Sequence, residues 1–580
     1  MRKMMTAILA AAFLLSVVLC GCGGGKQLNI VTVTPEMTSG HDGNLTEPVA
    51  TPEPVTTAGP ETTAEPESTP GPESTAGPGT TPGPESTATP EPESTAAPET
   101  DPPAPSTEDP GQTAQEPPEP LELLQYRTSH FDQTGSGGIL YMLLNQIRAS
   151  RELSDFSEGW RTAQQREFDE LHAEFLSAAD DPSSETAGLT RFIRSAVPRR
   201  ADDRILSLAF RDEYYYKDAE PVFSISSTLN LDPETGEELP LSAVVRDEEK
   251  LKEILLAAAG SRLPYAADDL DSGNFLWAVG YGEITFWLED GDYLPAGASY
   301  VPLTVSFADH EDLFTERALN VPERYIIPVP LNEEMTLPGG QELLLSLQEE
   351  ETAYGSYAVG ITLTVNGRSL IEKIPYGEEG APEDAYLLHE DGLPDLLYVT
   401  IPGLNGFART CAFRIDGDAP ERIGDYRESL GRAYYVIEED SSMYLVFREI
   451  PTDPRHFPME TPMHLLSSYT AHRYYARGAD GLPQPLSDWY GMIVERVLTL
   501  LQDLELPSYD RDTGTAGAAV SLHTGDTLQL IAADGDSRVL AVTEDGTVVL
   551  IELEYGQDSW QPRVNGIDID DLFDGMMFAG

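Results

Sequence analysis

The side chains that could carry out catalytic or metal chemistry are spread along this sequence without a recognised spacing. Its 580 residues include nine histidines. These form neither a His-x-His pair nor a His-Glu-x-x-His helix, which are frequent arrangements of zinc ligands. The sequence also lacks a Gly-x-Ser-x-Gly turn and a Ser-x-x-Lys pair, so common serine-nucleophile motifs are missing. We therefore predict no cofactor, no metal site and no catalytic residue.

Three local features come closest to a site. Cys411 lies in an apolar strand candidate, where a thiol is more often a small core residue than a nucleophile. Residues 389–395 read His-Glu-Asp-Gly-Leu-Pro-Asp and are similar to a short acidic calcium turn, although the length and ligand spacing differ from those of an EF-hand loop. His172 flanks the apolar stripe of a predicted helix, so we expect a solvated side chain there.

The first 21 residues have the pattern of an export signal. Two positive residues precede an apolar run over residues 4–19, which is short for a membrane span but fits the core of a signal peptide. The run ends Leu19-Cys20-Gly21-Cys22, which resembles the lipobox of bacterial lipoproteins. This resemblance implies cleavage after Gly21 and lipidation of the Cys22 thiol by a diacylglyceryl group. The alternatives are a secretory signal cut without lipidation and an uncleaved N-terminal helix.

Residues 22–120 are predicted to form a disordered stalk that follows the lipidated cysteine. From about residue 34 onward the chain repeats Thr, Pro, Glu, Ser, Gly and Ala, and it has almost no branched apolar or aromatic side chain to bury. No Lys or Arg lies between Lys26 and Arg127, so the glutamates repel one another while the prolines favour an extended chain. We expect the stalk to carry the rest of the protein away from the membrane.

The composition limits the partners of the folded part. The net charge of −63 argues against electrostatic binding to nucleic acid or to an anionic surface, and it favours a cationic partner. After the expected cleavage only Cys22 and Cys411 remain, so no disulfide can form within the chain. Stability must therefore come from the burial of apolar side chains, for which the residues after the stalk are sufficient.

Residues 121–323 are predicted to form an α+β domain, with helices packed on a mixed or antiparallel sheet. Alternating or apolar runs predict strands at 205–210, 221–230, 284–288 and 300–307. Helices are predicted from two apolar stripes at helical spacing. The stripes are Trp160, Phe168, Leu171 and Phe175, and Leu251, Ile254, Leu255 and Ala258.

Part of this region resembles a known family. Residues 230–241 follow the pattern Asn-x-Asp-x-x-Thr-Gly-x-x-Leu-x-Leu of the RsiV-like extracellular domain, and residues 204–210, 284–288 and 293–314 are similar to its other strands. In lysozyme-sensing anti-sigma factors this domain captures lysozyme, and a related domain accompanies the catalytic one in some peptidoglycan deacetylases. The resemblance implies a binding domain. Asp232, Thr235 and Gly236 are predicted to form a turn.

The remainder is predicted to be mainly β. Residues 324–510 contain short apolar runs at 358–365, 396–401, 412–415, 433–437 and 443–447, which indicate a sandwich or a few propeller-like blades. The segment 493–504 fits either a helix or a strand. Residues 511–580 are predicted to form a small SH3-like barrel with strands at 528–532, 539–542 and 548–553. We expect Ile567, Ile569, Leu572 and Phe573 to seal it.

These observations lead to two functional hypotheses. The first is a non-catalytic lipoprotein on the extracellular face of the cell membrane, projecting into or through the cell wall. It would bind an extracellular protein or a wall component, with lysozyme as the first candidate and peptidoglycan as the other. The alternative is a cell-envelope enzyme that modifies glycans, as a hydrolase or a deacetylase. Its site would be assembled from residues that lie far apart in the sequence.

Overall fold

The fold is described from a computed structural model of the chain. The predicted signal peptide, Cys22 and nearly all of the predicted stalk lie outside the described residues. The structure describes residues 117–578 apart from 135–137, 150–153, 179–187, 218–221, 261–262, 264, 290–299, 353–354, 375–383, 404–406, 418, 438–443 and 557–561. Within this part, no helix has the length and the hydropathy needed to cross a membrane.

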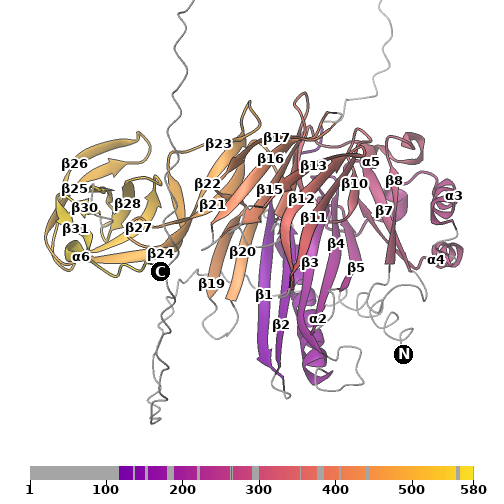
Figure 1. Ribbon diagram of the computed structural model, residues 1–580, viewed down its shortest axis with the longest axis horizontal. Coiled ribbons are helices and arrows are strands. Elements are labelled where there is room, and N and C mark those ends of the chain that lie inside the picture. Colours follow the sequence, from indigo (N-terminus) through magenta and orange to yellow (C-terminus); the bar gives the residue numbers. More distant parts are fainter. Residues whose placement is uncertain are drawn as a thin grey trace, which may run out of the picture. The chain divides into compact units, whose positions relative to one another are not determined.

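A seven-stranded sheet combines the start of the folded part with a hairpin from its middle (Figure 1). In spatial order its strands are β19 (Arg432–Ile437), β20 (Tyr444–Ile450), β1 (Leu123–Gln133), β2 (Ile139–Ala149), β3 (Leu189–Ala201), β4 (Leu206–Tyr216) and β5 (Val222–Leu231). Because β1 pairs with β20, the ranges 121–323 and 324–510 share one sheet, however the domains are divided. The division into domains itself stays a prediction.

The helix α2 (Ser154–Ala178) connects the one parallel strand pair of this sheet, β2 and β3. Parallel neighbours need a crossover connection, and a helix is its usual form. On the side of α2 that faces the sheet, Phe168 and Phe175 are buried against Leu140, Met142 and other residues of β2 and β3. The helix therefore covers one face of the sheet at this end.

A five-stranded sheet is buried on both of its faces. Its strands are β17 (Glu421–Tyr426), β16 (Ala408–Arg414), β15 (Leu396–Pro402), β14 (Asp384–Glu390) and β9 (Arg324–Pro328). In β15, Leu397 and Val399 point into a core shared with the next sheet, whereas Leu396 and Tyr398 point into a core shared with the seven-stranded sheet. This double burial explains why β15 is apolar at every position but Thr400, instead of at alternate ones.

The partner sheet completes a sandwich with the strands of residues 324–426. A sandwich was one of the two arrangements predicted for residues 324–510, but the later strands of that range belong to the seven-stranded and 11-stranded sheets. It contains β10 (Glu334–Thr336), β11 (Glu342–Thr352), β12 (Gly355–Val365) and β13 (Arg368–Lys373). Leu343, Leu345, Ile361 and Leu363 of this sheet pack against Phe413 and its neighbours in the five-stranded sheet.

An 11-stranded sheet holds most of the C-terminal part. It comprises β18 (Ser429–Leu430), β21 (Phe457–Met463), β22 (Tyr469–Arg477), β24 (Tyr490–Leu500), β27 (Thr527–Ala533), β28 (Arg538–Thr543), β29 (Val548–Glu552), β25 (Leu504–Asp510), β26 (Thr515–Leu522), β23 (Pro483–Pro485) and β32 (Phe573–Asp574). The three strands predicted near 528–553 are confirmed, and the ambiguous segment at 493–504 begins in strand β24. A hairpin of β30 (Arg563–Val564) and β31 (Ile567–Asp568) precedes the short helix α6 (Ile569–Leu572).

A three-stranded sheet and short helices complete the fold. The sheet contains β6 (Phe275–Val279), β7 (Glu283–Glu289) and β8 (Tyr300–Ser306), and the helices are α3 (Glu248–Ala259), α4 (Ala266–Ser272) and α5 (Glu316–Leu319). Asp247 caps α3 by accepting a hydrogen bond from the Lys250 N–H. Leu251 and Leu255 of the predicted stripe are buried, but Ala259 is buried in place of Ala258.

The predicted fold class is wrong in two respects. Strands dominate the whole described part, including residues 121–323, so this region is not an α+β domain on a mixed sheet. The strands expected to form a separate SH3-like barrel instead continue the 11-stranded sheet, because β27 pairs with β24. Ile569, Leu572 and Phe573 are buried there as expected, whereas Ile567 is only partly buried.

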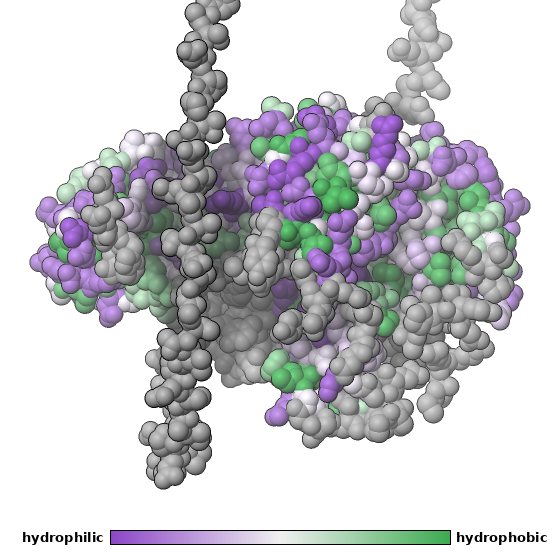
Figure 2. Space-filling model, in the orientation of Figure 1, coloured by the Kyte–Doolittle hydropathy of each residue, from purple (hydrophilic) through white to green (hydrophobic). Residues whose placement is uncertain are grey.

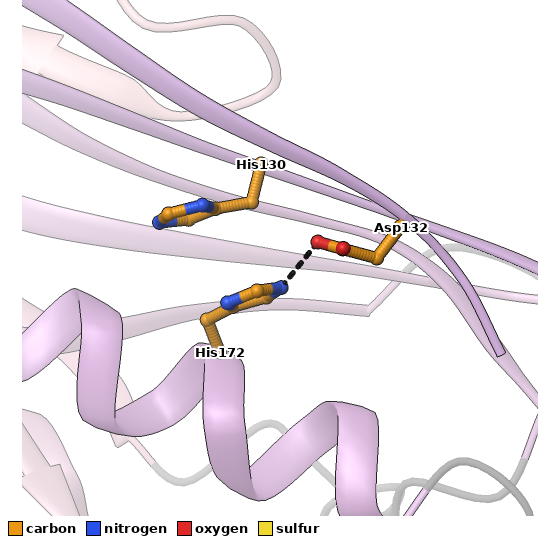
Figure 3. A group of neighbouring side chains, drawn as sticks. All are labelled: His130, Asp132 and His172. Atoms are coloured by element: carbon orange, nitrogen blue, oxygen red, sulfur yellow. Dashed lines mark hydrogen bonds and ion pairs between the residues drawn. The ribbon is translucent and has the colours of Figure 1, made fainter. Parts of the chain in front are cut away.

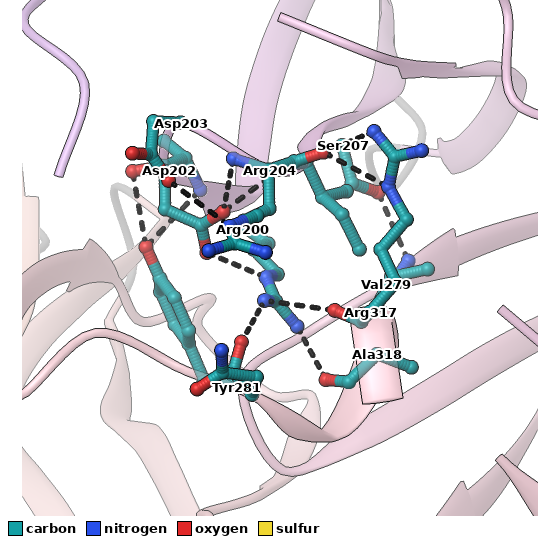
Figure 4. Close-up of polar contacts among 12 residues, drawn as sticks. Arg200, Asp202, Asp203, Arg204, Ser207, Val279, Tyr281, Arg317 and Ala318 are labelled. Atoms are coloured by element: carbon teal, nitrogen blue, oxygen red, sulfur yellow. Dashed lines mark hydrogen bonds and ion pairs between the residues drawn. The ribbon is translucent and has the colours of Figure 1, made fainter. Parts of the chain in front are cut away.

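A buried polar cluster around Arg200 ties β3 to α5 (Figure 4). Arg200 is 0% exposed, and its Nε donates to Oδ2 of Asp202 at 2.6 Å. Its Nη atoms donate to the carbonyls of Ala318 at 2.6 Å and Asn320 at 2.7 Å. The other oxygen of Asp202 accepts from the backbone N–H groups of Arg204 and Ile205. The guanidinium group is thus satisfied without water, as a buried charge requires.

Candidate functional site

A cavity of about 1060 Å³ lies in the described part of the chain. Figure 2 shows that hydrophilic side chains predominate on the face drawn and that hydrophobic ones form small separate patches. The cavity is therefore a more specific candidate site than any apolar patch on that face. Three sheets line it, through β1–β4 and β20 of the seven-stranded sheet, β9 and β14–β16 of the five-stranded sheet, and β18, β21, β22 and β24 of the 11-stranded sheet.

The lining of this cavity has the opposite charge to the chain. Its four arginines outnumber its three carboxylates, although the whole chain has a net charge of −63. The arginines are Arg127, Arg211, Arg448 and Arg496, and the carboxylates are Glu213, Asp384 and Glu460. Guanidinium groups bind carboxylate and phosphate in a bidentate manner, so the lining favours an anionic ligand.

Two of these arginines are engaged with carboxylates of the lining. Arg448 lies 2.6 Å from Asp384 and donates to the carbonyl of Leu430. Burial by itself lowers the pKa of Arg448, but Asp384, Tyr386 and Glu460 together outweigh burial and raise it. Arg211 lies 3.4 Å from Glu213.

The other two arginines make hydrogen bonds to neutral groups. Arg127 is exposed, and its Nε donates to Oδ1 of Asn145 at 3.0 Å. The amide of Asn145 in turn donates to Oγ of Ser195 at 2.9 Å, so these three side chains form a row across β1, β2 and β3. Arg496 donates to the carbonyl of Ser468 at 3.4 Å, and burial lowers its pKa.

Three aromatic side chains and an arginine form a row on the face of the seven-stranded sheet that also carries Arg127. The strand register places Phe131, Tyr141, Arg191 and Tyr215 side by side across β1–β4. The Arg191 guanidinium lies 5.8 Å from the ring centroid of Tyr141 and 5.1 Å from that of Tyr215. Arg127 lies four residues from Phe131 on the same strand, so alternation places both on this face. Rings beside arginines suit a ligand that has both flat surfaces and charges.

A serine and a histidine of the lining are hydrogen-bonded. Nδ1 of His464 and Oγ of Ser468 are 2.8 Å apart. The turn that holds them contains Leu466, which is fully buried and has a φ of 61°. Backbone in this region is strained for a leucine and is enriched at functional sites. A hydrolytic triad also needs a group that orients the histidine. No carboxylate bonded to His464 is found among the described residues.

Comparison with family models and with curated protein sequences found no match. Two similar solved structures are DUF3298 family proteins. They come from Bacteroides fragilis and from Pseudomonas aeruginosa PAO1. Each is 14% identical to this chain with a TM-score of 0.24, and the alignments cover 34% and 35% of this chain and 94% and 98% of theirs. DUF3298 proteins are related to RsiV-like domains.

The structure places most residues singled out in the sequence in structural roles. Cys411 is buried in the sandwich core as predicted, and burial raises the pKa of its thiol to about 11, so the thiol is not activated. Asp232 forms the predicted turn by accepting backbone N–H groups of Glu234 and Thr235, and Gly236 has a φ of 72°.

In the acidic turn at 389–395, the histidine of the turn contacts two of its carboxylates. Nδ1 of His389 lies 2.7 Å from Asp395, and Nε2 lies 3.2 Å from Asp391. Burial opposes the charged imidazole, but these two carboxylates outweigh it and raise the pKa of His389. Since both aspartates pair with the histidine, the contacts do not favour the calcium turn suggested by the sequence.

Sequence reasoning missed the residues that the structure brings together. The four arginines of the cavity are spread from residue 127 to residue 496 and have no common motif. His172 is half-buried and hydrogen-bonded to Asp132, so the prediction of a solvated flank is wrong. A usable signal was present in the spacings His130-x-Asp132 on a strand and Asp169-x-x-His172 on a helix, since each spacing places two polar side chains on one face.

Proposed function

We propose that this protein is a lipid-anchored surface lipoprotein whose folded part captures an anionic component of the cell envelope in the arginine-lined cavity. The observation that carries this proposal is the positive lining of the cavity in a strongly acidic chain. Peptidoglycan fragments are the first ligands to test. Their peptide stems offer carboxylates for arginines, and their sugar rings offer flat faces for aromatic side chains.

The size of the cavity supports a ligand of this kind. A volume of about 1060 Å³ lies just above the range for small-molecule sites, which is roughly 300–1,000 Å³. A disaccharide with a short peptide is a suitable occupant. Lysozyme, the first candidate from the sequence, is a cationic protein and would be attracted to the acidic outer surface instead of to this lining.

Replacement of Arg127 by alanine tests the cavity. A hydrogen bond to a charged group contributes about 1.5–3 kcal/mol, so we expect the affinity for a soluble muropeptide to fall about tenfold or more. Isothermal titration of the detergent-solubilised protein measures this change. The control is Arg563→Ala, which removes an exposed arginine outside the cavity. Equal affinities of the two variants for the muropeptide would show that the cavity is not the site.

Titration with lysozyme in the same experiment tests whether this second candidate ligand binds by charge attraction alone. Attraction by charge alone should disappear between 0.1 M and 1 M salt, because the Debye length falls from about 10 Å to about 3 Å. Should lysozyme binding partly survive at high salt and be unchanged in Arg127→Ala, the result would show that lysozyme binds to the outer surface and not to the cavity.

The pair of Ser468 and His464 favours a second candidate function, a hydrolase acting on envelope glycans. The two side chains meet in the same cavity, so a bound glycan would lie within reach of the serine hydroxyl. The wild-type protein and Ser468→Ala should be incubated with acetylated glycan fragments and their products analysed by mass spectrometry. Product that depends on Ser468 would favour the hydrolase, whereas ligand recovered intact would favour binding.

The lipid anchor predicts a change of location. We expect Cys22→Ser to release the protein from the membrane fraction, because the acceptor thiol is lost and a hydroxyl does not replace it. The control is Cys20→Ser, since Cys20 leaves with the signal peptide and its loss should keep the protein membrane-bound. Mass spectrometry of the mature N-terminus should find acyl chains on Cys22. Retention of Cys22→Ser in the membrane would contradict the anchor.

A further inference from the structure

A polar seam joins the strand β1 to the helix α2. Alternation along a strand places every second residue on one face, and helical periodicity places residues four and seven positions apart on one face. The two sets meet pairwise, and we call them the β1–α2 seam. Its pairs are Thr128 with Gln165 at 3.0 Å, His130 with Asp169 at 3.1 Å, and Asp132 with His172 at 2.7 Å.

Two histidines and an aspartate converge at the end of this seam (Figure 3). Figure 3 shows His130 and Asp132 reaching from the strand toward His172 on the helix. One ligand atom from each of the three residues lies within 4.8 Å of the others. The two imidazole rings are stacked, with centroids 4.1 Å apart and an angle of 4° between the planes. Their side chains are 19% and 17% exposed, so the group lies within reach of solvent.

The surroundings hold these side chains in place. Phe168 is fully buried on α2, and its ring stacks 5.5 Å from that of His130. Asp169 contacts Nε2 of His130 and is itself fixed by the Gln165 amide at 2.8 Å. A carboxylate on one imidazole nitrogen selects the tautomer whose other nitrogen is free to bind a metal. In the seam, Gln165 fixes Asp169, and Asp169 orients His130. Metal-binding histidines are commonly oriented by a carboxylate in this way.

We propose that His130, Asp132 and His172 form a binding site for a divalent transition-metal ion of the zinc class, with Asp169 orienting His130 through Nε2. Imidazole and carboxylate are ligands that zinc accepts, at roughly 2.0–2.2 Å. Three protein ligands leave the fourth tetrahedral position for water or for a group from a bound ligand. This inference is independent of the ligand proposed for the arginine-lined cavity.

Binding of the ion requires a defined adjustment. The lone pair of an imidazole nitrogen lies in the plane of the ring, so two parallel stacked rings do not point at one common centre. One ring must therefore turn about its Cβ–Cγ bond, and the ion then replaces the hydrogen bond between Asp132 and His172. Both changes are confined to side chains, which suits a site built between a paired strand and a packed helix.

Zinc chloride and cobalt chloride test the site. The untagged, detergent-solubilised protein is stripped with a chelator and titrated with zinc against a chelating dye. We expect one zinc ion per chain. We also expect a cobalt complex whose visible absorption is that of tetrahedral coordination, a readout that a salt-bridged seam without metal would not give. Absence of both signals from the folded wild-type protein would overturn the proposal.

Matched variants locate the ion. His172→Ala should weaken zinc binding by roughly 100-fold or more, since it removes one of three ligands and exceeds the loss typical of a supporting residue. Asp132→Asn serves as a second variant with nearly unchanged shape, should His172→Ala fail to fold. The control is His523→Ala, whose side chain is 72% exposed and lies outside the seam. If Asp132→Asn and a folded His172→Ala both keep the affinity of the wild type, the ion is bound elsewhere and the assignment fails.

Discussion

Replacement of Arg200 by leucine should lower the free energy of unfolding by about 3–5 kcal/mol, the cost of breaking a buried ion pair by removing one partner. Arg200 and Asp202 are both 0% exposed and form their contact at 2.6 Å. The leucine would leave the Asp202 carboxylate buried without its cation. It would also leave the carbonyls of Ala318 and Asn320 without the guanidinium donors that they share (Figure 4).

Urea unfolding followed by circular dichroism measures this loss. The control is Arg563→Leu, which breaks an ion pair with Asp568 whose side chains are 56% and 42% exposed. Exposed pairs contribute about 0–1 kcal/mol, so this control should unfold almost as the wild type does. A cost below about 1 kcal/mol for Arg200→Leu would mean that water reaches the cluster or that the site relaxes around the leucine.

Replacement of Phe168 by alanine should cost about 3–5 kcal/mol, the usual range for a fully buried phenylalanine. Phe168 is 0% exposed and lies between α2 and the sheet, where its ring centroid is 6.5 Å from that of Phe192. Because the ring also supports His130, the same change should loosen the β1–α2 seam. We therefore expect weaker zinc binding together with the loss of stability.

The control for Phe168→Ala is Leu486→Ala, since Leu486 is 53% exposed. Surface substitutions usually change stability by less than about 0.5 kcal/mol. Comparable unfolding midpoints for the two variants would show that α2 does not depend on Phe168 for its attachment to the sheet.

A strand that carries buried charged residues could not be recognised from its sequence pattern. In β3, Arg194 and Arg200 point inward, where Arg194 makes two hydrogen bonds to Asp212 of β4 and a third to Glu167 of α2. A charged residue at an inward position breaks the alternation of apolar and polar residues by which a strand is recognised. The strand β3 was therefore missed, and the helices received too much weight in the predicted α+β class.

Local features were accessible because neighbours in the sequence decide them. The turn at Asp232, the stripe of Leu251 and Leu255, and the strands near 528–553 depend on spacings of a few residues, and the structure has all of them. The burial of Cys411 also followed from its apolar surroundings. In each case one periodicity or one turn residue carries the information.

The tertiary structure alone decided where the candidate sites lie. Arg127 and Arg496 come from different sheets and meet in one cavity, and His130 and His172 meet because α2 packs against the sheet that contains β1. Such contacts depend on the order of the strands and on which faces of the sheets are covered. A short segment of sequence determines neither of these. The sequence by itself determined the acidic charge and the local elements. The positive cavity and the seam exist only because folding brings together a few polar residues from distant segments.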